Sequence, residues 1–481
     1  MISEFVREQK RYTKKELSRI LHCMEDRAIP LIRKLKEFGV LKAVRASQIQ
    51  RDLSVLLEED IEVADIETGE DAYLYVFTFV GVIVIAGCVL KCYPKYLMHT
   101  EAPRKELQQV LKVLQKYHAK EQRIRMFHDS SDSHSFHLLS VLLFLMQDYY
   151  ENGVYSNTET VMERNGSGEI LWEKTINETF TMISDNRPYY VELQTKKRVT
   201  DDHNYLKRLY ACMLTRASKE LQDADLLELF DLTAIDLTDE ELDEFGEEDE
   251  ILYRIEKELS VQFNTRKQMV LKAMYAYLAH RGHLCDAESF SLFGTNSFHL
   301  VWENVCADIM DNQLDVPLGS IALPVPLKPQ YDRKQKLVDL IEKPLWTASG
   351  KTAKDTLIPD LITIAKAGHE YQFIIFDAKY YNARLECGVS PKGQPGIESV
   401  TKQYLYQLAY QKFIEEHEFA SVKNCFLMPT ENPAVEVRGE VSMRMFHELG
   451  LQNIQVRFLP ADMAYEYYLS GRKMEIGILE L

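Results

Sequence analysis

Apolar side chains recur along this chain at two spacings, one typical of helices and one typical of strands. Between 297 and 311 they fall three or four residues apart, which predicts one buried helix face. That stripe is formed by Phe298, Val301, Trp302, Val305 and Ile309. Between 70 and 97 they alternate with polar residues or form short continuous runs, which predicts strands. The pattern as a whole predicts a mixed α/β protein of several domains.

The N-terminal region is predicted to form short helices followed by β structure. Thr13 is a predicted N-cap, and Glu16 completes a capping box with it. A second helix, with Pro30 in its first turn, should end at Gly39. Two helices leading into strands resemble a winged-helix arrangement. Such an arrangement binds DNA in some proteins and mediates only protein contacts in others, and the sequence leaves both open.

At 481 residues the chain has room for about three domains. We predict a winged-helix-like and β-rich domain at 1–130, for docking of DNA or a partner. A middle domain of helices, strands and an acidic segment is predicted at 131–284, with a strand over 170–176 and one long helix over 251–279. The third predicted domain, at 285–481, contains the residues of chemical interest.

Two apolar runs, 357–364 and 371–376, flank a short polar turn and predict a β-hairpin. If Gly368 and His369 form a two-residue turn, Asp360 lies directly opposite Asp377, with both side chains on the same face. Alternation along the strand places Lys379 on that face as well. Two acids and a lysine should therefore meet in a small volume.

This group of side chains suits phosphodiester hydrolysis. Mg²⁺, or Mn²⁺ in its place, prefers carboxylate oxygens, water and phosphate. Asp360 and Asp377 could bind such an ion, the carbonyl of Ala378 could add a ligand, and Glu303 could complete the shell from its helix. Lys379 would orient water or stabilise charge at phosphorus. In the alternative interpretation, Asp377 and Lys379 form only an ion pair at the edge of a sheet.

A helix predicted at 399–416 brings further polar groups. Gln403, Gln407 and Tyr410 fall at i, i+4 and i+7, so they share one face. The glutamines are candidates for the site, although a polar helix face is the simpler explanation.

The charge of the chain limits how it could meet DNA. The net charge is −17, which argues against a generally basic nucleic-acid binder. Residues 327–412 nevertheless carry 13 Lys and Arg against 9 Asp and Glu. A locally positive module on an acidic body is expected to need help from a partner.

Other motifs are less informative. The segment 347–352, TASGKT, lacks the first glycine of a nucleotide-binding P-loop. The apolar run 76–90 is short for a membrane span and is predicted to be a buried pair of strands. The eight cysteines show no metal or redox spacing and the chain begins without a leader pattern, so we predict a reduced cytoplasmic protein with no membrane association.

The pattern Pro359-Asp360…Asp377-Ala378-Lys379 resembles the PD-(D/E)xK nuclease superfamily. The segments FGTNSFHLVWENVC, KPLW, LIPDLITI, FIIFDAKYY and QYLYQLAY resemble the LlaJI family of restriction endonucleases, which is similar to the McrC nuclease subunit. The resemblance implies a restriction-endonuclease-like core at the C-terminus.

The same resemblance assigns roles. It makes Asp360 and Asp377 metal ligands, Lys379 the catalytic lysine and Glu303 the acid of the first core helix. It also matches Gln407, with Leu408 and Tyr410, to the Q-L-x-Y segment of McrC-like nucleases. It also implies double-stranded DNA as substrate, a McrB-like AAA+ GTPase as partner, and an associated DNA methyltransferase in the same restriction-modification system.

Two other functions stay open at this stage. A repair or recombination nuclease of the same superfamily would act without a GTPase. A catalytically silent subunit would only assemble the complex or dock DNA, although the intact acids and lysine argue against it.

Overall fold

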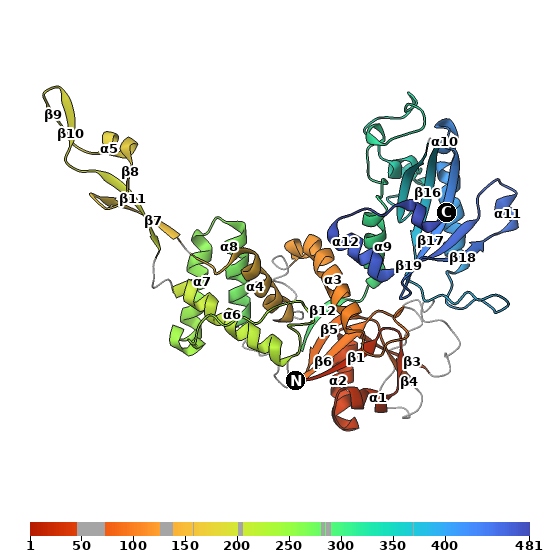
Figure 1. The fold of residues 1–481 in the computed structure, drawn as a ribbon, viewed down its shortest axis with the longest axis horizontal. Coiled ribbons are helices and arrows are strands. Elements are labelled where there is room, and N and C mark those ends of the chain that lie inside the picture. The colour runs from red at the N-terminus through yellow and green to blue at the C-terminus, as the bar shows by residue number, and fades with distance from the viewer. Residues whose placement is uncertain are drawn as a thin grey trace. The chain divides into compact units, whose positions relative to one another are not determined.

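The computed structural model describes residues 1–45, 73–125, 138–156, 158–200, 205–279, 284, 290–368 and 370–481. It divides into two compact units: residues 136–291 with Met1, and residues 2–135 with 292–481. The fold is mixed α/β, as predicted (Figure 1). The division into three domains stays a prediction.

The second unit begins with small sheets and three helices. These elements are β1 (Ile2–Arg7), β2 (Arg11–Tyr12), α1 (Lys14–Ile20), α2 (Glu25–Glu37), β3 (Leu41–Arg45), β4 (Tyr73–Phe77), β5 (Val80–Ile85), β6 (Cys88–Tyr93) and α3 (Arg104–Arg125). The predicted capping box of Thr13 and Glu16 is confirmed. The predicted buried strand pair is also confirmed, because every residue of β5 and β6 is buried. Pro30 lies inside α2, not in its first turn, because the helix already begins at Glu25.

Strand β12 (Phe290–Thr295) joins this N-terminal part to the rest of the unit. It completes a sheet of order β1-β6-β5-β12, while β2, β4 and β3 form a separate antiparallel sheet beside α1 and α2. Two glycines allow β12 to lie very close to its neighbour β5. A Cβ on Gly81 would lie 2.1 Å from the carbonyl oxygen of Phe293, and a Cβ on Gly294 would lie 2.2 Å from the carbonyl oxygen of Val80. The chain then leads directly into the next helix.

The C-terminal part of this unit is built on a five-stranded sheet. Its elements are α9 (Phe298–Ile309), η4 (Leu318–Ser320), η5 (Leu337–Leu340), β13 (Leu345–Trp346), β14 (Lys351–Thr352), β15 (Leu361–Ala367), β16 (Glu370–Ala378), α10 (Ile397–Glu416), β17 (Ser421–Thr430), β18 (Glu436–Val441), α11 (Arg444–His447), β19 (Ile454–Pro460), α12 (Ala461–Ser470) and η6 (Ile476–Leu479).

The strand order of this sheet is β15-β16-β17-β19-β18, with β16, β17 and β19 parallel. Apolar residues of β15 and β16 pack with α10 in one core cluster, which includes Ile362, Phe373, Ile375 and Tyr410. The predicted apolar stripe of α9 is confirmed, since all five of its residues are buried. The TASGKT segment forms the turn and the second strand of the β13–β14 hairpin, and residues 353–360 after it are not helical.

The first unit packs four helices and carries a strand-rich extension, the arm, at 158–200 (Figure 1). Its elements are α4 (Leu138–Asn152), β7 (Thr158–Arg164), β8 (Glu169–Ile170), α5 (Trp172–Glu178), β9 (Thr181–Ser184), β10 (Arg187–Tyr190), β11 (Gln194–Thr200), α6 (Tyr205–Asp223), η3 (Leu242–Phe245), α7 (Glu248–Val261) and α8 (Thr265–Ala279).

Two predictions for the first unit are wrong. The segment predicted as a strand over 170–176 is mainly helix α5, because pairing with β11 ends at Ile170. The predicted long helix is interrupted between α7 and α8. There the side chain of Asn264 accepts a hydrogen bond from the Lys267 N–H, 3.1 Å away, and so begins a new helix.

Within the described ranges, none of the helices has both the length and the apolar character needed to cross a bilayer.

Candidate active site

The hairpin of β15 and β16 brings the two predicted acids together. Leu361 pairs with Phe376 and Ala367 pairs with Glu370, which confirms the predicted register. Asp360 and Asp377 therefore lie opposite each other, one step beyond the first pair. Gly368 adopts a φ of +65° in the turn, a conformation that glycine accepts readily. The other predicted turn residue, His369, lies outside the described residues.

The two carboxyl groups lie in contact. A hydrogen bond links the side chains of Asp360 and Asp377. Asp360 Oδ2 also accepts a hydrogen bond of 2.8 Å from the backbone N–H of Ala378. Asp377 is only 3% exposed. Two acids so close in a poorly solvated place cannot both carry a full negative charge without a compensating cation.

Lys379 supplies one positive charge to this group. Its Nζ lies 2.8 Å from Asp377 Oδ1, and its side chain is 22% exposed. Burial alone would lower the pKa of Lys379, but the carboxyl groups of Asp377 and Asp360 raise it above its usual value. The side chain is therefore a cation at neutral pH.

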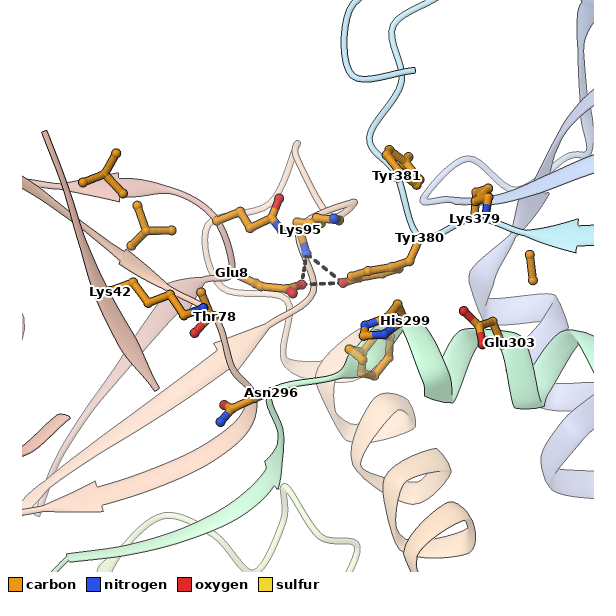
Figure 2. A pocket seen from close by; sticks show the side chains of 15 residues that line it. Glu8, Lys42, Thr78, Lys95, Asn296, His299, Glu303, Lys379, Tyr380 and Tyr381 are labelled. Atoms are coloured by element: carbon orange, nitrogen blue, oxygen red, sulfur yellow. Dashed lines mark hydrogen bonds between the residues drawn. The ribbon is translucent and has the colours of Figure 1, made fainter. Parts of the chain in front are cut away.

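Helix α9 holds Glu303 beside this group. The indole N–H of Trp302, the preceding residue, donates to the carbonyl oxygen of Leu427 at 3.2 Å. The same oxygen accepts a hydrogen bond of 2.8 Å from the backbone N–H of Lys379. The helix that carries Glu303 and the backbone of Lys379 thus share one hydrogen-bond acceptor. Figure 2 shows Glu303 and Lys379 at the same end of a cavity.

Burial and crowding raise the pKa values of the acids. Burial raises the pKa of Glu303 to about 7; Lys379 opposes this shift and Asp377 adds to it. The pKa of Asp360 is well above its ordinary value, first because of burial and then because of its hydrogen bond to Asp377 and the charges of Asp377 and Glu303. The positive charge of Lys379 alone therefore does not balance the cluster of Asp360, Asp377 and Glu303.

This donor set fits a hard divalent cation. Such an ion prefers oxygen ligands and, in the case of Mg²⁺, keeps several waters while taking one or two protein carboxylates. Asp360 and Asp377 meet that requirement, and the proton that the raised pKa of Asp360 favours would be displaced by a cation. Among the described residues, no three acidic, histidine or cysteine side chains come together tightly enough to enclose an ion by themselves.

The two glutamines lie on the buried face of α10 but make different contacts. Gln403 donates from Nε2 to the carbonyl oxygen of Ile375 at 2.8 Å, and its Oε1 is buried without a hydrogen-bond partner. Gln407 accepts hydrogen bonds through Oε1 from Asn424 Nδ2 at 2.6 Å and from the Gln452 N–H at 3.0 Å. Gln407 therefore links α10 to β17 and to the segment before β19; its hydrogen bonds with described residues do not include the acids.

Sequence reasoning missed Tyr406 as a neighbour of the acids. Burial raises the pKa of its hydroxyl, and the charges of Asp377, Asp360 and Glu303 raise it further. Tyr406 lies three residues after Gln403, so helical spacing alone would have placed it on the same face.

The residues after Lys379 connect the site to the start of the chain. The Tyr380 hydroxyl donates a hydrogen bond to Glu8, and the backbone N–H of Lys95 lies 3.2 Å from Glu8 Oε2 (Figure 2). Glu8 and Tyr380 are both buried. No periodicity in the sequence could have indicated this contact.

Comparison with known proteins identifies the family of this chain. A family model of restriction endonucleases matches residues 79–324 and 328–462. The family is that of the LlaJI restriction endonuclease, and the chain belongs to it. The chain is also 26% identical over 409 residues to component YdjA of the type II restriction enzyme BsuMI of Bacillus subtilis strain 168, which covers 82% of this chain and 81% of that protein.

Two solved assemblies show a weaker likeness. One is the half-complex of Thermococcus gammatolerans McrB AAA+ hexamers with bound McrC, at 13% identity and a TM-score of 0.39, covering 98% of this chain and 99% of the matched chain. The other is the McrBC complex of the same organism, at 14% identity and a TM-score of 0.25, covering 63% and 84%.

The raised pKa of Glu303 gives a first prediction. The folded state holds this proton more tightly than the unfolded state, so the associated stability is present at low pH and is lost as pH rises through about 7. Glu303→Gln resembles the protonated form. In chelator-treated protein it should raise the urea midpoint over wild type more at pH 8 than at pH 5. Glu415→Gln, at an exposed position, is the control. If Glu303→Gln and wild type differ in urea midpoint by the same amount at both pH values, the raised pKa of Glu303 is contradicted.

The contacts of Gln407 give a second prediction. Gln407→Met removes the acceptor for two hydrogen bonds. It leaves a buried N–H of Asn424 unpaired, at a cost of about 1–3 kcal/mol, whereas the N–H of exposed Gln452 can bond water. Urea denaturation should show this loss at every pH. Gln411→Met, one turn later and paired only with exposed Glu415, should change stability little. A Gln407 variant as stable as wild type would show that these bonds contribute nothing.

Proposed function

We propose that this chain is a Mg²⁺-dependent endonuclease that cleaves double-stranded DNA in a restriction-modification system, with a PD-(D/E)xK core in its C-terminal part. The observation that carries the proposal is the pair Asp360 and Asp377, opposed across a hairpin, with the Lys379 ammonium 2.8 Å from Asp377. Membership of a restriction endonuclease family supports the same chemistry.

Each residue has a proposed task. Asp360 and Asp377 hold the ion, with the Ala378 carbonyl and Glu303 able to add ligands directly or through water. When bound, Mg²⁺ neutralises charge on the phosphoryl oxygens and promotes ionisation of water. Mn²⁺ should support the same arrangement, because it also favours carboxylate, carbonyl and water ligands.

The remaining groups act on the attacking water. Lys379 is protonated at neutral pH, so it cannot accept a proton; instead it orients the water and stabilises negative charge at phosphorus. The pKa of Glu303, about 7, suits a group that takes the proton of that water. As the water oxygen bonds to phosphorus, one phosphorus–oxygen ester bond breaks and the DNA strand is cut.

The glutamines support this site from α10. Gln403 fixes the helix to the strand that ends at Asp377, and its unpaired Oε1 is available to an ordered water. Gln407 acts at a distance by fixing α10 against β17. We assign both to positioning.

A McrB-like AAA+ GTPase is the proposed partner, as the family resemblance implies. The sequence of this chain has no P-loop, so nucleotide hydrolysis has to come from another protein. The net charge of −17 also gives the chain little attraction for DNA from afar. A methyltransferase of the same system would protect host sites, and the winged-helix-like N-terminal region would dock DNA or a partner.

The arm at 158–200 is the surface that best fits a protein partner. It concentrates large exposed apolar side chains, which mark interaction sites. These include Phe180 at 80% exposed, Ile183 at 77%, Val191 at 63% and Trp172 at 53%. We assign this surface to the AAA+ subunit.

Cleavage should depend on Asp377. Asp377→Asn should lower the cleavage rate by roughly 100-fold or more with Mg²⁺ present, because the ion loses a charged ligand and Lys379 loses its anchor. Rates are measured on plasmid DNA, in the presence of the partner GTPase and GTP. Asp355→Asn, an exposed acid five residues before Asp360, is the matched control and should cut normally. An Asp377 variant that cuts at the wild-type rate would refute the site.

Loss of apolar side chains from the arm should weaken partner binding. The double change Phe180→Ser and Ile183→Ser should lower affinity for the AAA+ subunit roughly tenfold or more, because buried apolar anchors dominate such interfaces. Binding is measured with purified proteins. Phe263→Ser, at a position that is 94% exposed in the same unit, is the control. Efficient cleavage by this chain alone, with no partner or GTP, would instead favour a stand-alone repair nuclease.

A further inference from the structure

A cavity of about 340 Å³ extends from the candidate active site toward the N-terminal strands (Figure 2). Glu303 and Lys379 lie at one end. Lys42, from β3, lies toward the other end, and Lys95 and His299 lie between them. The cavity is therefore formed jointly by the region that carries the acids and by the first hundred residues of the chain.

The groups that line this cavity make it suitable for an anion. Burial lowers the pKa of His299, and the positive charges of Lys95 and Lys379 lower it further. The charges of both lysines therefore reach the part of the cavity where His299 lies. Lys42, which also lines the cavity, forms no ion pair with any described residue. Because the chain as a whole is strongly acidic, Lys42 and Lys95 in one cavity, beside Lys379 in its ion pair with Asp377, are a local exception.

Two acids, Glu8 and Glu303, also line the cavity, and Glu8 is held by other groups of its wall. Glu8 is 6% exposed, and burial raises its pKa above the ordinary value, although Lys95 and the Tyr380 hydrogen bond oppose the shift. Its carboxyl group is already engaged by the Tyr380 hydroxyl and the Lys95 N–H. The Lys95 ammonium lies 4.5 Å from the centre of the Tyr380 ring. Buried groups thus fix this wall of the cavity.

Helix α9 adds backbone donors. It begins at Phe298, which lines the cavity, and no side chain caps its first turn. The free N–H groups and positive end of a helix favour an anion. This feature is secondary to the lysines, but it lies at the same place.

We propose that this cavity binds a backbone phosphate of the DNA strand, next to the phosphate that is hydrolysed, and that Lys42 contacts it. The proposal rests on the nuclease function given above. Lys42 then makes the N-terminal region part of the DNA-binding surface and fixes the position of the strand relative to Asp377. Phosphate contacts of this kind position DNA without reading its sequence.

The test combines a protein change with a DNA change. The full chain carries Asp377→Asn to prevent cutting, and its DNA affinity is measured with Lys42, Lys42→Gln or Lys42→Arg. Each phosphate near the cut site is replaced in turn by a neutral methylphosphonate. One such replacement should weaken binding by Lys42 and Lys42→Arg proteins several-fold but leave Lys42→Gln unaffected. If every position weakens binding equally in all three proteins, the proposal is wrong.

Salt dependence provides an independent readout. Lys42→Gln should reduce the slope of log affinity against log salt by about 0.9, the value for one lost phosphate contact. Lys15→Gln, at an exposed position of α1 outside the cavity, should show no coupling to the same methylphosphonate. Inorganic phosphate is added separately. Stabilisation by inorganic phosphate that needs Lys42, without any coupled DNA position, would assign the cavity to free phosphate and overturn the proposal.

Failure of this proposal can be told apart from failure of the nuclease function. In the cleaving protein, Lys42→Gln should raise KM for DNA with little change in kcat, because it holds a part of the strand that does not react. If the wild-type chain with its partner neither binds nor cuts DNA, the proposed function is wrong. If it cuts normally and Lys42→Gln has the wild-type KM and salt slope, only the cavity assignment is wrong.

Discussion

The hydrogen-bonded pair of Asp360 and Asp377 is the constraint on which the C-terminal part of this protein depends. Placing two carboxyl groups in contact away from water costs the folded protein free energy, and the surrounding fold has to hold them there. The hairpin register places them opposite each other, and apolar side chains of the same two strands pack against α10. The energy gained by packing the sheet therefore maintains an arrangement that, by itself, favours the neutral acid.

The acids are held by elements from distant parts of the chain. Leu427, in the middle of the sheet, accepts hydrogen bonds from both Trp302 and the backbone of Lys379, so α9 and the end of β16 share one anchor. Helix α9 follows strand β12, and the close approach of β12 to β5 requires Gly81 and Gly294. A displacement of the N-terminal sheet would thus be transmitted to Glu303 through only a few residues of chain.

The sequence was informative where a local rule applied. Period-two alternation and a two-residue turn predicted the facing of Asp360 and Asp377, and the 3.6-residue period predicted α9 and its buried stripe. Prediction failed where a short break or a distant contact decided the outcome. Asn264 begins a new helix within a stretch whose apolar pattern looked continuous. The bond between Tyr380 and Glu8 joins residues 372 positions apart, and no pattern within either segment encodes it.

The bond between Tyr380 and Glu8 also bears on the order in which the surroundings of the acids are assembled. Glu8 precedes Tyr380 by 372 positions, so it leaves the ribosome long before Tyr380 and the strands beside it. The strand β17 that flanks Asp377 is itself paired with β19, which ends at Pro460. Because chains fold from the N-terminus as they emerge, the acids have their full surroundings only after β19 has also been made. A chain released between Tyr380 and Pro460 would carry both acids without all the strands that support them.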